Sequence, residues 1–305
     1  IQTLRCPMAK IQSNGLTLEY ESLGDENAPV ILLIMGLGMQ MIAWPDPFCD
    51  LLVARGHRVI RFDNREVGLS QKLDHLGKPQ VGRAILRALM GLRVPAPYTL
   101  EDMVRDTAGL LDALEIEKAH VVGASMGGMI AQLFACHYPE RTLSLTSLMS
   151  TTGSRKAGRP STRMLRLLMR QPADPKDLNC VVEHFESLFK VIGSPAYPTP
   201  QEDLRALLRT TVERGYHPEG VLRQMNASLA SGDLSPVLGM VRCPALVIHG
   251  KSDPLIPYTA GNDTAVRIRD AKLVLLDGYG HDFPPQLNER LANLIAGHAA
   301  AAEDR

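Results

Sequence analysis

The sequence has few cysteines, no excess of either charge and no long apolar run. Its five cysteines are scattered without a C-x-x-C pair, which argues against a cysteine-bound metal cluster or a disulfide framework. Lys and Arg together number 33, as do Asp and Glu, so no net charge draws the chain to nucleic acid or an anionic membrane. No stretch approaches the ~20 apolar residues of a membrane-spanning helix. We therefore expect a globular protein with a small-molecule substrate, no nucleic-acid partner and no integral membrane span; its oligomeric state stays open.

The first ten residues, IQTLRCPMAK, lack the apolar core of a secretory signal peptide. The scattered thiols suit a reducing compartment, so a cytoplasmic location is expected. Because the chain begins at Ile1 rather than Met, earlier removal of an export signal stays open.

Short apolar runs alternate with stretches at helical spacing over most of the chain. Runs such as VILLIMG (30–36) are apolar throughout, as in strands that helices cover on both faces. This alternation predicts an α/β fold with a mostly parallel, doubly wound sheet. Strands are expected at 30–36, 57–64, 119–123, 143–150, 245–250 and 272–278, and helices near 46–55, 99–115, 127–138, 257–268 and 284–299.

Two local signals sharpen this outline. The stretch IQSNGLTLEYESLG (11–24) predicts a hairpin that turns at Asn14-Gly15. At the start of the helix expected over 99–115, Thr99 and Asp102 have the spacing of a capping box. Both signals place element boundaries without any long-range information.

Residues 153–240 contain no strand-like run. Four helices are expected there, near 161–170, 175–191, 200–214 and 218–230, and Asp174-Pro175 and Thr199-Pro200 mark two of their starts. An all-helical stretch between two strands of one sheet indicates an insertion. The sequence thus divides into an α/β core of residues 11–152 and 241–300 and a helical cap of residues 153–240.

The stretch GASMG (123–127) fits the G-x-S-x-G pattern of a nucleophile elbow, between an apolar run and a helix-like stretch. A serine Oγ attacks a substrate only if it stands clear of the sheet end, which requires a sharp turn. Side chains two residues before and after would collide in that turn, so glycine suits both positions. Ser125 is therefore the candidate nucleophile; the alternative is a glycine-rich turn that packs a helix on the sheet.

A nucleophilic serine needs a base, and the base needs an orienting carboxylate. His281 follows the last expected strand, in the loop GYGHDFP, and Asp253 follows the preceding strand. Both lie at the carboxyl edge, where open α/β sheets place their ligands. Other carboxylates end strands or adjoin the histidine: Asp63, Asp277 and Asp282. We favour Asp253 as the acid, and expect Asp277 to support loop geometry and Asp282 to point away.

The order Ser125, Asp253, His281 is that of the α/β-hydrolase fold. Together with MGLG (35–38), WPDPF (44–48) and RFDNREVGLS (61–70), it makes the chain resemble serine esterases of that fold. The likeness is strongest to the branch of aclacinomycin methylesterase-like proteins and looser to cofactor-free haloperoxidases and perhydrolases. It implies hydrolysis of a carboxylic ester by acyl transfer, with no metal and no organic cofactor.

The resemblance also implies an oxyanion hole. By motif position its donors are the backbone N–H groups of Leu37 and Met126. Gly36 and Gly38 would let the backbone approach the substrate carbonyl. Trp44, the only tryptophan, is expected either to line the substrate pocket or to pack on the helix that follows.

The expected cap carries the question of specificity. Its apolar side chains form either a ceiling over the acyl group or the buried faces of cap helices: Leu165, Leu167, Leu168, Met169, Phe185, Leu188 and Phe189. The basic stretch 154–170 either attracts an anionic substrate or membrane surface or forms a solvated face. The same triad would serve a C–C bond hydrolase, lactonase, perhydrolase or acyltransferase. From another class, a small-molecule receptor of this fold is the alternative.

Overall fold

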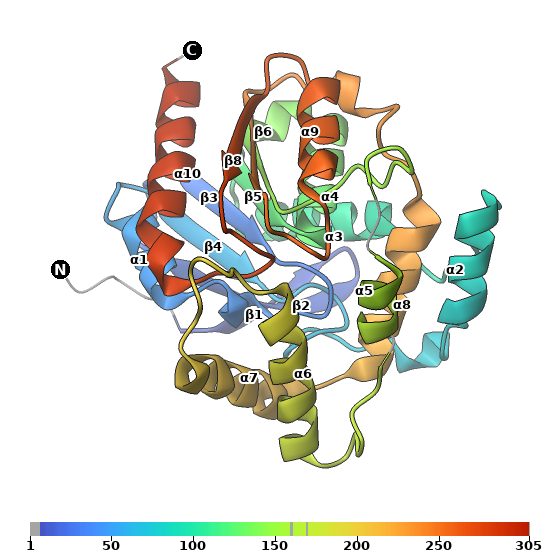
Figure 1. The fold of residues 1–305 in the computed structure, drawn as a ribbon. Coiled ribbons are helices and arrows are strands. Elements are labelled where there is room, and N and C mark those ends of the chain that lie inside the picture. The colour runs from blue at the N-terminus through green and yellow to red at the C-terminus, as the bar shows by residue number, and fades with distance from the viewer. Residues whose placement is uncertain (1–6, 159–160, 169, 305) are drawn as a thin grey trace.

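The computed structural model describes residues 7–158, 161–168 and 170–304. An eight-stranded sheet forms its centre, with helices on both faces (Figure 1). The strands are β1 (Ala9–Ser13), β2 (Leu16–Leu23), β3 (Val30–Ile34), β4 (Arg58–Phe62), β5 (Ala119–Ala124), β6 (Thr142–Leu148), β7 (Ala245–Gly250) and β8 (Lys272–Leu276). The helices are α1 (Asp46–Val53), α2 (Val81–Met90), α3 (Leu100–Ala113), α4 (Met126–His137), α5 (Thr162–Leu168), α6 (Leu178–Ile192), α7 (Gln201–Gly215), α8 (Pro218–Ser231), α9 (Tyr258–Arg267) and α10 (Asn288–Glu303).

The strands are ordered β1-β2-β4-β3-β5-β6-β7-β8. Strands β3 to β8 pair in parallel, whereas β1 and β2 add an antiparallel edge next to β4. The hairpin between β1 and β2 turns at Asn14 (φ 49°) and Gly15 (φ 77°), as a two-residue type I′ turn requires. The predicted mostly parallel sheet and its N-terminal hairpin are therefore confirmed.

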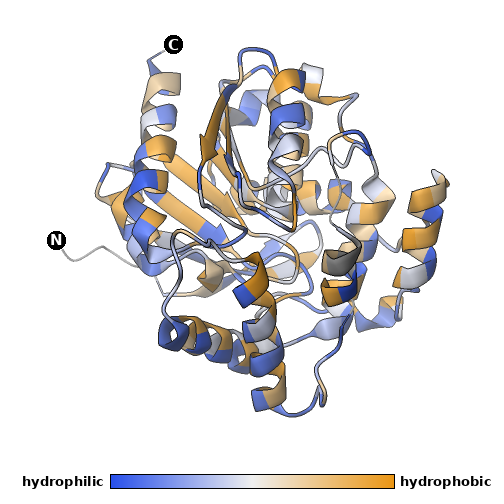
Figure 2. Ribbon diagram, viewed as in Figure 1, coloured by the Kyte–Doolittle hydropathy of each residue, from blue (hydrophilic) through white to orange (hydrophobic). Residues whose placement is uncertain are grey.

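Strand β3 shows why the central strands are apolar throughout. Leu32 and Ile34 pack in the core layer under α3 and α4, whereas Ile31 and Leu33 pack in the layer under α1 and α10. Because helices cover both faces of the sheet, a polar side chain at any position of this strand would be buried. Figure 2 shows the result as apolar strands flanked by helices of mixed character.

Helices α5 to α8 lie between β6 and β7 in the chain, and α6 and α7 lie below the sheet in Figure 1. A small apolar cluster joins these two helices, formed by Val181 and Val182 of α6 and Leu208 and Val212 of α7. This cluster is separate from the two layers that cover the sheet.

Several predicted boundaries were wrong. Helix α6 begins at Leu178 rather than 175, because the side chain of Asp177 accepts a hydrogen bond from Asn179 N and caps it there. Helix α10 begins at Asn288 rather than 284 and continues to Glu303. Helix α2 was missed altogether. The capping box at Thr99 and Asp102 is present.

Helix α2 interrupts the alternation of strands and helices from which the core helices were predicted, since it lies between β4 and α3. Only Val81 and Ala84 are buried, whereas Leu86, Leu89 and Met90 are more than half exposed. Its apolar residues nevertheless recur on one side at helical spacing, so the pattern was present in the sequence. In the part of the chain described, no helix combines the length and hydropathy that crossing a bilayer would need.

Candidate active site

Ser125 occupies a sharp turn between β5 and α4. Its backbone has φ 55° and ψ −121°, a conformation that L-residues rarely adopt. A Cβ at Gly123 would lie 2.1 Å from the carbonyl oxygen of Gly127, and a Cβ at Gly127 would lie 2.1 Å from that of Ile34. The turn therefore closes only with glycine at both positions, as the sequence pattern predicts.

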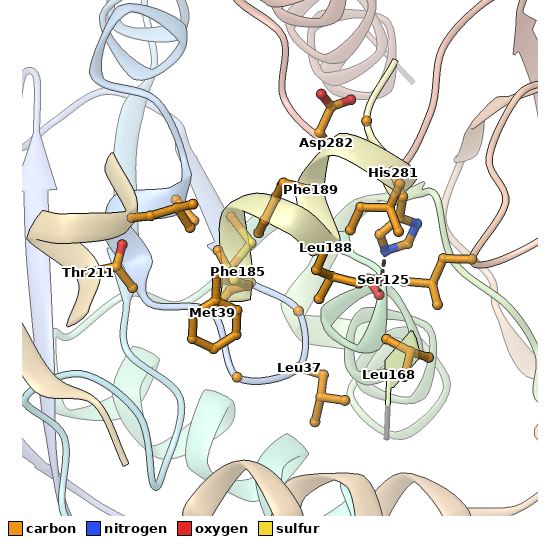
Figure 3. Close-up of a pocket in the computed structure, with 18 of the residues that line it drawn as sticks. Leu37, Met39, Ser125, Leu168, Phe185, Leu188, Phe189, Thr211, His281 and Asp282 are labelled. Atoms are coloured by element: carbon orange, nitrogen blue, oxygen red, sulfur yellow. Dashed lines mark hydrogen bonds between the residues drawn. The ribbon is translucent and has the colours of Figure 1, made fainter. Parts of the chain in front are cut away.

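The structure brings Ser125, His281 and Asp253 together. His281 Nε2 lies 3.1 Å from Ser125 Oγ, and His281 Nδ1 lies 2.7 Å from Asp253 Oδ2 (Figure 3 shows the serine and the histidine). His281 and Asp253 are 8% and 6% exposed. The serine comes from the end of β5, the acid from the loop after β7 and the histidine from the loop after β8.

The surroundings of Asp253 favour its ionised form. Its Oδ1 accepts hydrogen bonds of 2.8 Å from the backbone N–H groups of Leu255 and Ile256. Burial by itself raises the pKa of this carboxyl, but the charge of His281 and the hydrogen bonds from His249, His281 and Ile256 outweigh it and hold the pKa well below its usual range. An ionised Asp253 accepts a hydrogen bond from His281 Nδ1–H, which directs the Nε2 lone pair toward Ser125.

The rival carboxylates have other partners. Asp63 accepts hydrogen bonds from the backbone of Met41 and Leu69 and pairs with Arg214. Asp277 is exposed and pairs with Lys251. Asp282 accepts a hydrogen bond from Ser194 Oγ, and burial raises its pKa despite that bond. In Figure 3 its carboxylate points away from Ser125.

The two residues expected to supply oxyanion donors come from different elements next to Ser125. Met126 opens α4, and Leu37 lies in the loop after β3; within the described chain neither N–H donates a hydrogen bond. A Cβ at Gly36 would lie 3.0 Å from Ser125 Cβ, so that residue passes close to the serine. Gly38, with φ 68°, donates its N–H to Gln224 Oε1 at 2.9 Å. The loop thus lies where an oxyanion-binding loop would.

Trp44 does not line the cavity beside Ser125; of the two environments expected for it, the structure shows the packed one. Its side chain is fully buried and its ring lies 5.7 Å from that of Phe48 and 4.7 Å from that of Phe283. Arg61 donates a hydrogen bond to its backbone carbonyl. The indole therefore fills the space between α1 and the loop after β8, while its neighbours Ala43 and Pro45 reach the cavity wall.

A cavity of about 820 Å³ opens beside Ser125 and His281. Of the side chains expected as a ceiling, Leu168 of α5 and Phe185, Leu188 and Phe189 of α6 line it (Figure 3). Leu167 is not among the lining residues. Met169 and the side chain of Leu165 lie outside the described part of the chain.

Helices α7 and α8 contact the loop that carries Leu37, an interaction that no sequence pattern predicted. Gln224 of α8 is fully buried; its Oε1 accepts from Gly38 N and its Nε2 donates to the carbonyl of Arg65. Gln40 Nε2 donates to two carbonyls at the end of α7. A glutamine on a helix has no spacing that marks such a role, so only the tertiary structure reveals it.

A serine in a strained turn, a histidine facing it and a buried carboxylate behind the histidine, all at the carboxyl edge of this sheet, define an α/β-hydrolase. Comparison with known proteins agrees. The model of the alpha/beta hydrolase fold family matches residues 29–179, and that of a TAP-like protein family matches residues 232–297. The chain belongs to the α/β-hydrolase family.

Two named relatives and one solved structure are similar to the chain over nearly its whole length. The chain is 29% identical to rhodomycin D methylesterase DnrP of Streptomyces peucetius, over 97% of this chain and 99% of the relative. It is 28% identical to rhodomycin D methylesterase DauP of Streptomyces sp. (strain C5), over the same shares. The crystal structure of the enol-lactonase from Burkholderia xenovorans LB400 superposes with a TM-score of 0.71 at 22% identity, over 97% of this chain and all of that one, which shows the shared fold.

Proposed function

We propose that the chain hydrolyses carboxylic esters by two-step acyl transfer, with Ser125 as nucleophile, His281 as base and Asp253 as the acid that orients the base. The protein is a carboxylic ester hydrolase of the α/β-hydrolase family. One observation supports the residue roles most directly: His281 bridges Asp253 at 2.7 Å and Ser125 at 3.1 Å through its two ring nitrogens. Such a bridge is the arrangement by which a serine hydroxyl is deprotonated as it attacks.

In the first step His281 Nε2 takes the proton of Ser125 Oγ as the oxygen attacks the ester carbonyl. The N–H groups of Leu37 and Met126 donate to the oxyanion of the tetrahedral intermediate. Collapse of this intermediate breaks the bond to the alcohol, which leaves with the proton from His281. Asp253 stabilises the imidazolium during this step.

In the second step a water molecule gives a proton to His281 and attacks the acyl-enzyme. The carboxylic acid product then leaves, and Ser125 regains its proton from the imidazolium. Each proton is transferred between His281, Ser125, the leaving alcohol and water, so the cycle restores the enzyme.

We further propose a bulky, apolar acyl group and a small alcohol such as methanol. The cavity of about 820 Å³ lies in the upper range of small-molecule pockets and is walled by apolar side chains of α5 to α8. Two similar proteins are methylesterases of rhodomycin D, which supports a methyl ester. In this proposal residues 153–240 act as a cap, and the enzyme works in the cytoplasm, where thiols such as Cys49 and Cys136 stay reduced.

Paired substrates and variants test the proposal. Ser125→Ala should lose turnover of p-nitrophenyl acetate and of methyl anthracene-carboxylate alike, whereas His75→Ala, at an exposed histidine, should keep both. Leu188→Asn places an amide in the acyl wall and should raise KM for the anthracene ester about tenfold while p-nitrophenyl acetate is little affected. Leu178→Asn, at an exposed position of the same helix, is the matched control.

Full activity of Ser125→Ala would refute the mechanism. Equal effects of Leu188→Asn on the small and the large ester would refute the acyl assignment and leave the mechanism standing.

A further inference from the structure

Three potential metal ligands meet near the amino ends of strands β4 and β5, whereas Ser125 follows the carboxyl end of β5. His57 directly precedes β4, His120 is the second residue of β5, and Glu303 is the last residue of α10. One ring nitrogen of each histidine and one carboxylate oxygen of Glu303 lie within 4.8 Å of one another. His120 and Ser125 are five positions apart along one extended segment, so the cluster lies roughly 16 Å from the nucleophile.

The fold explains why these residues meet. His120 pairs in register with Ile31 of β3, and β3 pairs in parallel with β4, which His57 precedes. Ile31 belongs to the core layer under α1 and α10, so the same face of the sheet carries this cluster. Helix α10 crosses that face and ends above it, and the partial negative charge at a helix C-terminus favours a cation.

The two histidines are buried in a way that leaves donor atoms for a metal ion. His57 and His120 are 6% and 1% exposed. Within the described chain His57 Nδ1 is buried and has no hydrogen-bond partner. A buried ring nitrogen without a partner is costly unless something compensates it.

A hydrogen bond outside the cluster fixes the ring of His120. Its Nδ1 lies 2.9 Å from Ser144 Oγ, while its Nε2 faces Glu303 Oε1. Outer hydrogen bonds of this kind orient the histidines of metal sites.

We propose that His57, His120 and Glu303 bind a divalent transition metal, with Zn²⁺ as the best match. Two histidines and one carboxylate are an established zinc ligand set, and water completes the tetrahedron. Bonds of about 2.0–2.1 Å place tetrahedral ligands about 3.3 Å apart. His120 Nε2 and Glu303 Oε1, at 2.9 Å, need only separate slightly, because Glu303 is at the exposed end of its helix. The bound ion would fasten α10 to β4 and β5.

Zinc binding to the chelator-treated full chain tests the site. Isothermal titration with ZnCl₂ should give one tight site per chain, and about 100-fold excess over Kd should raise Tm by about 5 °C. Co²⁺ should give the visible absorption of a tetrahedral complex. Glu303→Gln should weaken Zn²⁺ binding at least about tenfold, and His57→Gln should do the same.

Two controls separate this site from others. Glu303→Gln should hydrolyse p-nitrophenyl acetate like the wild type, which shows that it is folded and leaves Ser125 and His281 intact. His75→Ala, at an exposed histidine away from the cluster, should bind Zn²⁺ like the wild type. Absence of a saturable site, or wild-type affinity in Glu303→Gln, would overturn the proposal; so would zinc binding that inhibits hydrolysis equally in that variant, since the ion would then sit at His281.

Discussion

His281 Nε2 and Ser125 Oγ lie 3.1 Å apart, although the two residues are 156 positions apart in the chain. Their strands, β8 and β5, are separated in the sheet by β7 and β6, a span of about 14 Å. The loop after β8 must therefore reach back along the sheet edge. Hydrogen bonds from His281 N to Ile192 O and from Gly280 N to Ser194 Oγ hold it there. The end of α6 thus positions the proposed base.

Asp253→Asn should show that Asp253 orients His281 and does not bind the substrate. The amide keeps the size of the side chain but cannot hold His281 in the tautomer that accepts the proton of Ser125, so kcat should fall about 10³–10⁴-fold with little change in KM. Steady-state kinetics with p-nitrophenyl acetate measure both constants. Asp277→Asn, at the exposed rival carboxylate, is the control and should keep wild-type kinetics. A loss of less than tenfold in Asp253→Asn would remove Asp253 from the triad.

Gly36→Ala should impair catalysis more than folding. A Cβ there meets Ser125 Cβ at 3.0 Å and Ala124 O at 3.2 Å, so the loop that carries Leu37 must move by a few tenths of an ångström. Loss of one oxyanion donor costs about 10²–10³ in kcat. Gly82→Ala, in α2, meets nothing within 4 Å and should leave kcat unchanged while it stabilises the helix by up to about 1 kcal/mol. Unaltered kcat in Gly36→Ala would show that the loop is not an oxyanion hole.

Gln224→Leu tests whether α8 positions the same loop. The change removes the acceptor of Gly38 N and the donor to Arg65 O, so the loop loses its tie to α8. We expect kcat to fall about 10- to 100-fold, together with a loss of stability of about 1–3 kcal/mol from unpaired buried groups. Asn226→Leu, at another position of α8, removes a hydrogen bond to Pro95 O and should lower stability without lowering kcat. Equal effects of both variants on kcat would contradict a positioning role.

Asp282→Asn should make the protein more stable than the wild type at neutral pH but not at acidic pH. Burial raises the pKa of Asp282 above 3.8, against the hydrogen bond from Ser194, so the folded state holds its proton more tightly than the unfolded state does. The free energy of unfolding that depends on this carboxyl is present at pH below 3.8 and is lost as pH rises through the raised pKa. The variant does not ionise, so its Tm should exceed that of the wild type at pH 7 and approach it near pH 4. A lower Tm for Asp282→Asn at pH 7 would contradict this.

The sequence was sufficient where local chemistry decides the outcome. The elbow at Ser125 needs glycine two residues before and after, and that spacing is visible without a structure. The hairpin at Asn14-Gly15 and the capping box at Thr99 and Asp102 likewise depend on a few adjacent residues. Apolar strands that alternate with helices were enough to predict the mostly parallel sheet.

Long-range packing decided what could not be predicted. Trp44 had two possible environments, and only the approach of Phe283 from the C-terminal part of the chain selects the buried one. Gln224 and Gly38 meet through the folding of α8 onto the loop after β3, which no spacing encodes. The cluster of His57, His120 and Glu303 joins three distant segments in the same way. Helix α2 was missed for another reason: its apolar residues follow helical spacing, but it interrupts the alternation of strands and helices.

The central claim is that Ser125 is the nucleophile of an ester hydrolase, and covalent labelling tests it most directly. The native protein would be treated with a fluorophosphonate, weighed intact by mass spectrometry and digested to locate the label. The account predicts one label per chain, on the peptide that contains Ser125, with loss of esterase activity in proportion to labelling and slower labelling in His281→Ala. Labelling of a different residue, or full esterase activity in the fully labelled protein, would contradict it.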